Sequence, residues 1–446
     1  MAMRYDRWLA ARLADAYQSG APTVREMQQR AVVTLGEQPT WLASLTRRMW
    51  RRFQQGWEGA SAYALSEAIL ADRGFQQGLA VSARPVQVRH IFLPPPRALP
   101  PDSLASQYGL PALRCAGDLM HWLRLTPEDL DWLTQARGAP RKAASALGHY
   151  TYRWLDKPRG GARLLEAPKV WLKGIQRRIY QEILAPLPLH EAVHGFRAQR
   201  SSLTHARVHV GQALLLKFDL KDFFPSVGYP QVYRVLRRLG YGHEVTRLLS
   251  RLCTQVTPNE ILRSPAARHL ERGEELFRRA HLPQGAPTSP ALANLVAAHL
   301  DRRLSALADS MGRRYSRYAD DFVLSGALMS PGAIERLQAL VGAIALEEGF
   351  VLNTRKSAVI GQGARQQVGG VVVNAKANIS RKDYDELKAV LHNCLRFGPD
   401  GQNRQGHGDW AAHLRGKIAY VAGINPQKGR KLLALYQRII WPQESA

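Results

Sequence analysis

The sequence contains only three cysteines, Cys115, Cys253 and Cys394, and they lie far apart. Their spacing excludes a disulfide framework and a cysteine-based zinc site, and it is typical of proteins in a reducing compartment. No apolar run approaches the ~18 residues that a membrane-spanning helix needs. The N-terminal stretch carries charges among its apolar residues and has no cleavage pattern, so it does not predict a secretory signal. We therefore expect a soluble cytoplasmic protein with no membrane partner.

Acidic residues are also scarce: there are 36 Asp and Glu against 62 Lys and Arg, a formal net charge of +26. This charge favours a polyanionic partner, most simply nucleic acid, because Lys and Arg attract phosphates whatever the base sequence. Hydrophobic residues make up 45% of the chain, which excludes wholesale disorder. At about 100–200 residues per domain, the length of 446 residues allows two to four structural units.

The spacing of apolar residues separates helical segments from a mixed centre. Helices are predicted at 1–84 (with a basic amphipathic stretch at 41–53), 102–138, 170–184, 291–307 and in two stretches after Arg381. A proline-rich connector is expected at 93–101, and a hairpin with a basic tip at 149–169. A buried strand is predicted at 213–220, a second hairpin at 313–326 and a further strand at 366–374.

Acidic residues stand at the ends of two of these strands. Asp219 ends the buried strand, and Asp320 and Asp321 form the tip of the second hairpin. Adjacent carboxylates repel each other, and a carboxylate beside an apolar strand is costly unless it is solvated, paired or bound to a cation. Mg²⁺ prefers a few carboxylates with water and phosphate oxygens, so the three acids predict a site for two Mg²⁺ ions that catalyse phosphoryl transfer. Taken singly, each acid also fits a helix cap or ordinary turn chemistry.

Two further patterns are compatible with a binding function. The loop LPQGAPTSP at 282–290 has the Gly and Pro content of a shaped loop that lies close to a flat ligand such as a base pair, although it also fits an ordinary loop. The pairs His190 and His194, and His205 and His209, have a spacing that suits a metal on a helix. No Glu or Cys completes either set, so we expect these histidines to be structural or to contact RNA.

In this order, the motifs resemble the palm of a reverse transcriptase. FDLKDFFPSV resembles its first motif, LPQGAPTSP its second and RYADD its third, within a similarity that covers about residues 150–375. The forms DLKDFFPS and PQGAPTSP resemble bacterial retron reverse transcriptases most closely. Two elements tied to recognition of the cognate RNA depart from the family: His205 replaces Asn in Asn-Ala-x-x-His, and Gly369 replaces Thr in Val-Thr-Gly.

The resemblance implies an α+β fold, a right-hand polymerase with fingers, a ferredoxin-like palm, a helical thumb and a helical N-terminal extension. The implied domains are the extension at 1–100, N-terminal helices and fingers at 101–210, the palm at 211–375 with a fingers insertion near 230–280, and the thumb at 376–446. The basic stretch at 41–53 in the extension is expected to pack on the polymerase, bind structured RNA or touch an effector protein.

The resemblance also implies residue roles. Asp219, Asp320 and Asp321 would be the catalytic metal ligands, joined by the backbone carbonyl of Leu220. The nucleotide-binding residues would be Lys157 and Arg163 at the triphosphate, Phe224 as a steric gate against a ribose 2′-OH, Gln284 and Gly285 at the base pair, and Lys356 as a general acid. The RNA-binding residues would be Arg197, His209, Lys417, Lys428, Arg430 and Lys431. Each role has an alternative: Phe224 could be an aromatic residue of the core, and the basic residues could be solvated surface charges.

The implied function is RNA-directed DNA synthesis from deoxynucleoside triphosphates in a bacterial cytoplasm. A retron enzyme copies part of a structured noncoding RNA, primes from an internal guanosine 2′-OH, leaves RNA-linked single-stranded DNA, and commonly serves antiphage defence with a partner effector protein. Two alternatives stay open. One is a group II intron-like or other defence reverse transcriptase with a different primer, and the other is a non-catalytic RNA-binding scaffold on a polymerase fold.

Overall fold

The computed structural model describes residues 2–60, 62–82, 85–92, 103–134, 148–157, 160–270 and 272–441. The chain divides into two compact units, Met1–Glu128 with Leu236–Leu249, and Asp129–Val235 with Ser250–Ala446. Within the described ranges, no helix combines the length and apolar character needed to cross a membrane. The predicted proline-rich connector at 93–101 lies outside the described residues.

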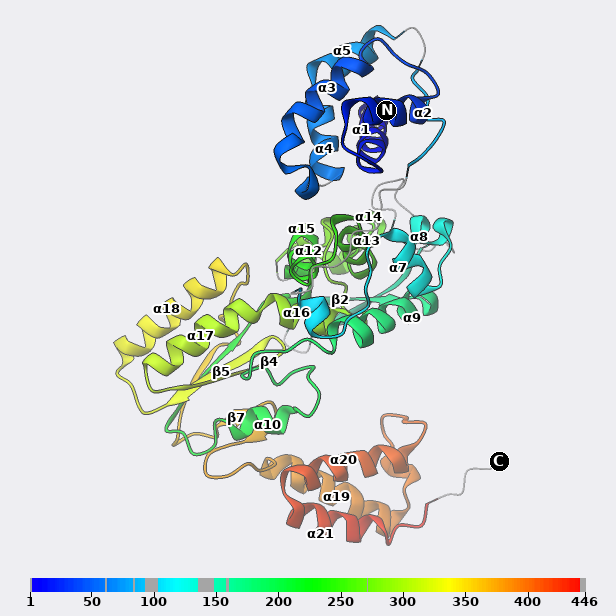
Figure 1. The fold of residues 1–446 in the computed structure, drawn as a ribbon. Helices are drawn as coiled ribbons and strands as arrows, with labels where there is room; N and C mark the ends of the chain where they lie inside the picture. Colours follow the sequence, from blue (N-terminus) through cyan, green and yellow to red (C-terminus); the bar gives the residue numbers. More distant parts are fainter. Residues whose placement is uncertain are drawn as a thin grey trace. The chain divides into compact units, whose positions relative to one another are not determined.

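The first unit contains a bundle of helices with its own apolar core (Figure 1). Its helices up to residue 123 are α1 (Ala2–Gln18), α2 (Val24–Leu35), α3 (Leu42–Phe53), η1 (Gln54–Gly59), α4 (Ala62–Leu70), α5 (Arg73–Val81), α6 (Leu104–Gln107) and α7 (Ala116–Leu123). Helix α3 confirms the helix predicted at 41–53, since Leu42, Leu45 and Met49 are buried while its four arginines lie elsewhere on the helix. The buried Tyr17 hydroxyl lies 2.9 Å from the Thr46 hydroxyl and ties α1 to α3.

One carboxylate in this core makes a pH-dependent contribution to stability. Asp15 is 8% exposed and pairs with Arg12 at 3.0 Å. Burial, with repulsion from Glu244, raises the pKa of Asp15 to about 6 in spite of Arg12. A raised pKa in the folded state means that the ionised form is disfavoured there. The stabilisation from protonated Asp15 is therefore complete below the unfolded pKa of about 3.9 and is lost as the pH rises through about 6.

Asp15→Asn, which is neutral at every pH, is thus expected to be more stable than the wild type at pH 8. The gain is about 3 kcal/mol at pH 8 and falls to about 1 kcal/mol at pH 4.5, as measured by thermal unfolding of the full chain. Asp118→Asn is the matched control. Hydrogen bonding to Arg114 lowers the pKa of Asp118, so its ionised form stabilises the fold and this variant is expected to be less stable than the wild type at pH 8. A loss of stability at pH 8 in the Asp15 variant would contradict this account.

The second unit begins with a hairpin that was predicted from the sequence. After α8 (Pro127–Thr134), strands β1 (Tyr150–Asp156) and β2 (Ala162–Pro168) pair antiparallel, as predicted for 149–169. Pro158 and Arg159 at the tip lie outside the described residues. Helix α9 (Val170–Ile179) follows and ends in a π-turn, η2 (Tyr180–Leu184). Leu164 of β2 packs in a small core with Leu262 and Phe277 from the segment near 260–280.

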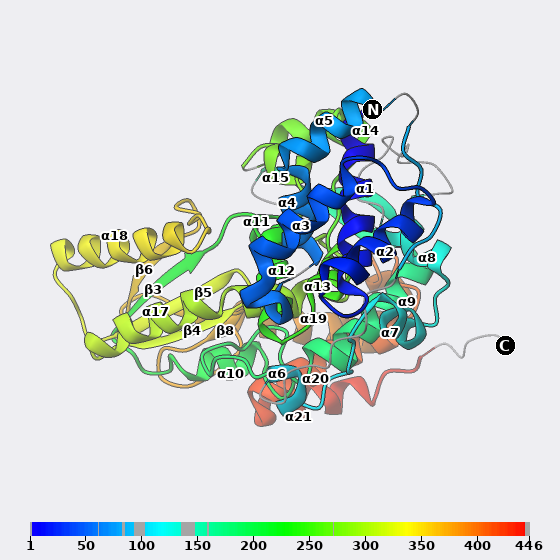
Figure 2. The same cartoon turned by 45° about the horizontal axis from the view of Figure 1, so that its top comes forward.

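A four-stranded antiparallel sheet forms the centre of this unit, in the order β4-β5-β3-β6. Its strands are β3 (Leu214–Asp219), β4 (Arg314–Tyr318), β5 (Asp321–Gly326) and β6 (Ala358–Gly361), and Figure 2 shows β3, β5 and β6 side by side. The apolar run of β3 is buried on both faces, which is why it forms a central strand. In Figure 1, α17 (Ala298–Ser310) and α18 (Pro331–Glu347) lie along one face. On the other face, Leu215 and Val323 pack with Ala206 of α10 (Ser202–Arg207).

The described residues form further helices, and those after Arg381 pack around an apolar core of their own. The further helices are α11 (Phe223–Ser226), α12 (Tyr229–Arg238), α13 (His243–Cys253), α14 (Asn259–Leu262), η3 (Pro265–His269), α15 (Glu275–Arg278), α16 (Ser289–Val296), α19 (Arg381–Phe397), η4 (Asp400–Gln402), α20 (Trp410–Ile424) and α21 (Pro426–Tyr436).

Three sequence predictions need correction. The single helix expected at 291–307 is two helices, α16 and α17, which are interrupted at Ala297. The strand expected at 366–374 is a short hairpin, β7 (Gln367–Val368) and β8 (Val371–Val372), because Gly369 and Gly370 adopt positive φ and reverse the chain. The second C-terminal helical stretch divides into α20 and α21, since Asn425 caps α21 and Pro426 begins it.

Candidate active site

The register of the central sheet brings two of the predicted acids together. Asp219, the last residue of β3, is paired with Asp321, the first residue of β5. Asp320 lies in the turn before β5, and its backbone carbonyl accepts a hydrogen bond of 2.9 Å from the amide of Leu220. The three carboxylates therefore stand at one edge of the sheet, although they come from two separate segments of the sequence.

The electrostatics of these acids differ from one another. Asp219 is 4% exposed, and the Nζ atom of Lys356 donates to its Oδ1 atom at 2.8 Å. Burial and repulsion by Asp219 raise the pKa of Asp320, while the charges of Lys356 and Arg163 act in the opposite direction. Desolvation by the surrounding protein, with repulsion from Asp320 and Asp219, raises the pKa of the exposed Asp321 to about 6. Burial and mutual repulsion therefore disfavour the ionised forms of Asp320 and Asp321.

This donor set fits a divalent cation of the Mg²⁺ type. All three side chains offer hard oxygen ligands, and the raised pKa values of Asp320 and Asp321 indicate that a further positive charge is favoured at this edge. Among the described residues, no three His, Cys, Asp or Glu side chains meet closely enough to enclose a metal ion. A cation bound here would therefore need water or phosphate oxygens to complete its coordination, which is the usual arrangement for Mg²⁺.

Lys356 lies in the segment between α18 and β6, and its ion pair with Asp219 places it directly at the acidic edge. Its side chain is 36% exposed, so solvent and small ligands reach it. The sequence left open a solvent-exposed lysine in a turn as an alternative. The ion pair shows that this residue belongs to the acidic site, whatever its chemical role.

The loop with Gln284 and Gly285 is held against strand β2. The amide of Glu166 donates to the carbonyl of Gln284 at 2.8 Å. Gly285 has a φ of +130°, and a Cβ atom there would lie 3.2 Å from the carbonyl oxygen of Glu166, so only glycine fits without strain. Glu166 is itself fully buried, and its carboxylate lies 2.8 Å from His281 Nε2 and accepts at 2.6 Å from Thr257 Oγ1.

The predicted triphosphate residues lie on the β1–β2 hairpin. Arg163 is exposed on β2 opposite Leu155, and it lies near enough to Asp320 to influence the pKa of that carboxyl. The amide of Lys157 donates to the carbonyl of Gly161 at 3.0 Å and so closes the end of the hairpin. Arg163 thus has an electrostatic link to the acidic edge.

The two neighbouring phenylalanines after Asp219 lie in different environments. Phe223 is 4% exposed and packs near Phe350, so it is a core residue. Phe224 is half-buried, and its ring centroid lies 6.0 Å from that of Phe196. Phe196 also lies 6.4 Å from Tyr318 beside the acidic turn, so these rings form an aromatic wall next to the site.

The predicted RNA-binding residues are not all at the surface. His209 is fully buried, and its two ring nitrogens lie 2.7 Å from the hydroxyls of Ser325 and Ser316. This position favours the structural role that the sequence left open for it and leaves no exposed ring atom for RNA. Arg197 is half-buried and donates to the carbonyl of His190 at 3.0 Å.

The basic residues of the C-terminal helices are mostly accessible. Lys417 on α20 and Arg430 and Lys431 on α21 are exposed. Lys428 is half-buried, with its Nζ atom 4.7 Å from the centre of the Tyr384 ring. The three exposed side chains are available to phosphates, whereas Lys428 also supports the packing of α21 on α19.

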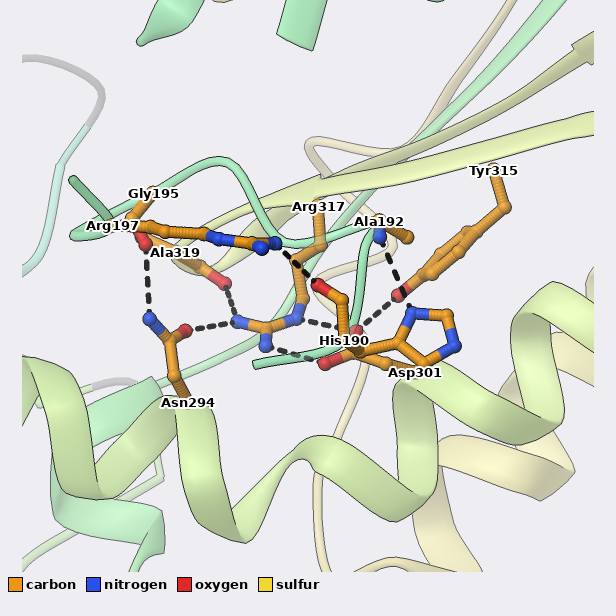
Figure 3. A network of polar contacts seen from close by, with 9 residues as sticks. All are labelled: His190, Ala192, Gly195, Arg197, Asn294, Asp301, Tyr315, Arg317 and Ala319. Carbon is orange, nitrogen blue, oxygen red and sulfur yellow. Dashed lines mark hydrogen bonds and ion pairs between the residues drawn. The ribbon is translucent and has the colours of Figure 1, made fainter. Parts of the chain in front are cut away.

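Sequence reasoning missed the buried polar residues that hold this site together. Arg317, Asp301 and Asn294 form a network behind the acidic turn (Figure 3), and Glu166 with His281 forms a second network behind the Gln284 loop. The sequence did contain one indication of the first network. Arg317 is two residues after Tyr315 and so shares its face of a buried strand, where a buried arginine requires an acidic partner. Asp301 was missed because, in the sequence, it resembles any solvent-facing polar residue of a long helix.

Comparison with known proteins agrees with this geometry. Residues 155–372 match the model of the reverse transcriptase (RNA-dependent DNA polymerase) family. Retron Mx65 reverse transcriptase of Myxococcus xanthus is 38% identical over 334 residues, which cover 75% of this chain and 74% of that protein. Retron Mx162 reverse transcriptase of the same organism is 35% identical, with 75% and 68% covered. Retron Ec86 reverse transcriptase of Escherichia coli is 28% identical, with 74% and 91% covered.

Among solved structures, a foamy viral protease-reverse transcriptase in complex with double-stranded DNA is 14% identical, with a TM-score of 0.34. The match covers 68% of this chain and 42% of that one.

The α+β architecture, the acid-bearing antiparallel sheet and the family match define a right-hand polymerase that directs DNA synthesis from an RNA template. Within that class, the chain belongs to the retron reverse transcriptases. Polymerases of this kind generally use divalent metal ions and act on a nucleic acid template and primer.

Proposed function

We propose that this enzyme synthesises DNA by two-metal nucleotidyl transfer at the edge formed by Asp219, Asp320 and Asp321. The observation that carries the proposal is the β3–β5 register, which pairs Asp219 with Asp321 and bonds Leu220 to Asp320. Two bound Mg²⁺ ions would supply charge neutralisation for the attacking and leaving oxygens. The carboxylates would hold these ions, and the backbone carbonyl of Leu220 would face the one on the nucleotide side.

The chain's own residues would position the deoxynucleotide for attack by the primer hydroxyl on its α-phosphate. Arg163 and Lys157 would bind the triphosphate, while Gln284 and Gly285 would line the base-pair pocket. Phe224 would crowd a ribose 2′-OH. Lys356 would give a proton to departing pyrophosphate, and its 2.8 Å ion pair with Asp219 supports a place for it at the acidic edge.

The domain roles extend the same proposal. Residues 101–210 would supply the fingers with an insertion near 230–280, and 211–375 would form the palm. Residues 376–446 would form a thumb whose exposed Lys417, Arg430 and Lys431 follow the phosphates of an A-like duplex. The half-buried Arg197 and Lys428 would contribute at the edges of the RNA-binding surface. The helices of residues 1–100 would form an extension to the polymerase.

As for the product, we propose that the enzyme copies part of a structured noncoding RNA from an internal guanosine 2′-OH. The product would be single-stranded DNA linked to RNA, and the system would serve antiphage defence with an effector protein. Support comes from the retron relatives, two of which are at least 35% identical. A group II intron-like enzyme would use a separate primer instead.

Sequencing the nucleic acid that copurifies with the full chain, expressed with its neighbouring genes, tests this proposal. The expected result is one discrete RNA joined to DNA through a 2′,5′ linkage that a debranching enzyme cleaves. Heterogeneous RNA without attached DNA would overturn the retron product and favour a different primer.

A further inference from the structure

One arginine behind the acidic turn is wholly enclosed by protein. Arg317 on β4 is 0% exposed and is among the largest fully buried side chains of the described residues. A buried guanidinium is tolerated only where its N–H groups are bonded and its charge is paired. Asp301 on α17 provides both, since it accepts at 2.7 Å from Nε and at 2.7 Å from Nη2 of Arg317.

The remaining donors of Arg317 reach the acidic turn itself. Its Nη1 atom donates to the backbone carbonyl of Ala319 at 2.9 Å and to Asn294 Oδ1 at 3.0 Å (Figure 3). Ala319 is the residue immediately before Asp320, and it has a φ of +57°. This left-handed conformation is unfavourable for a residue with a Cβ atom, and it persists only where the surroundings hold it.

A second segment closes on the same turn. Asn294 also donates through Nδ2 to the carbonyl of Gly195 at 2.9 Å. A Cβ atom on Gly195 would lie 2.5 Å from the amide nitrogen of Ala319, so the two backbones are in direct contact. Arg317 therefore bonds the turn directly, Asn294 links Arg317 to Gly195, and the backbone of Gly195 packs against the turn.

We propose that Arg317 is a positioning residue for metal binding and DNA synthesis, because it locks the left-handed turn at Ala319 that presents Asp320 beside Asp219. Arg317 does not touch substrate or metal; it acts through the backbone of the turn. The inference rests on the proposed metal role of the three aspartates. It adds that a residue outside the site holds Asp320 in position.

Arg317→Lys separates this role from general stability. A lysine keeps the charge that Asp301 requires but cannot bond Asp301, Asn294 and the Ala319 carbonyl together. Mn²⁺ binding to the full chain, followed by electron paramagnetic resonance of the free ion, measures the effect without relying on activity. We expect binding about 10-fold weaker than in the wild type and a similar loss in kcat, with a smaller change in KM.

Two further variants give the test its specificity. Tyr315→Phe removes the 2.8 Å hydrogen bond to Asp301 from the same network but leaves the bond to Ala319, so Mn²⁺ affinity is expected to stay near the wild-type value. In the double variant Arg317→Lys/Ala319→Gly, glycine adopts the left-handed turn freely. We therefore expect the double variant to bind Mn²⁺ nearly as tightly as Ala319→Gly alone. If Arg317→Lys acted only by disturbing the core packing, glycine at 319 would not restore the affinity.

Asp320→Asn serves as the reference for the metal role. If it leaves Mn²⁺ affinity unchanged, the proposed function fails. If it weakens binding while folded Arg317→Lys binds like the wild type, or if glycine at 319 gives no rescue, only the positioning role fails. Should Arg317→Lys not fold, the double variant Arg317→Met/Asp301→Asn replaces it, since it removes the bond from Arg317 to the Ala319 carbonyl without leaving either member of the buried ion pair as an unpaired charge. Unchanged Mn²⁺ affinity in that variant would overturn the inference.

Discussion

Replacing Asp320 by asparagine will reduce DNA synthesis by about a thousandfold while leaving the protein folded. The amide keeps the size of the side chain but removes the anionic oxygen that a metal ion needs. Because burial and Asp219 raise the pKa of Asp320, the fold disfavours its charge, and neutral asparagine should not lower stability. Single-nucleotide extension of a primer on an RNA template with Mg²⁺ measures the rate, and thermal unfolding measures stability.

Asp309→Asn is the matched control for this prediction. Asp309 is exposed near the end of α17, so the same chemical change there is expected to leave the rate at the wild-type level. Wild-type incorporation by the Asp320 variant would show that the acidic edge is not the catalytic centre, and the scaffold alternative would then gain support.

Replacing Phe224 by alanine will weaken discrimination against ribonucleotides by roughly 100-fold. Its half-buried ring stands in the aromatic wall with Phe196 beside the acidic turn, where it would meet a 2′-hydroxyl of the incoming sugar. Alanine opens that space. The ratio of kcat/KM for dCTP and CTP on the same primer and template measures the change.

Phe223→Leu provides the comparison, because Phe223 is buried and faces the core near Phe350. We expect this variant to lose stability and to keep the wild-type discrimination. If Phe224→Ala discriminates as well as the wild type, Phe224 has no gate role, and the core explanation weighed from the sequence would apply to it.

Local patterns predicted most of the elements around the site. The apolar run before Asp219 gave strand β3, and alternating residues around Ala319 gave the β4–β5 hairpin. These features depend on burial along a short segment, which a single sequence displays directly. Breaks at Ala297 and at Gly369–Gly370 were missed because each depends on how the neighbouring segments pack rather than on local propensity.

Partnerships between distant residues were the part that the sequence did not reveal. The ion pairs Lys356–Asp219 and Arg317–Asp301 each join separate elements. The sequence around Lys356 or Arg317 does not indicate which acid will be its partner. The same holds for His209, whose spacing from His205 is compatible with surface or core and whose burial is visible only in the fold. Long-range pairing is set by sheet register and helix packing. These depend on many distant segments at once, so no short stretch of the sequence reveals them.

The most direct measurement is anomalous diffraction from crystals of the full chain grown with Mn²⁺, a primer–template duplex and a non-hydrolysable deoxynucleotide analogue. We expect two manganese peaks roughly 3.5–4 Å apart, held by Asp219, Asp320 and Asp321 together with the phosphates of the analogue. Manganese bound elsewhere, or the three carboxylates left without a cation while the analogue is in place, would contradict this expectation.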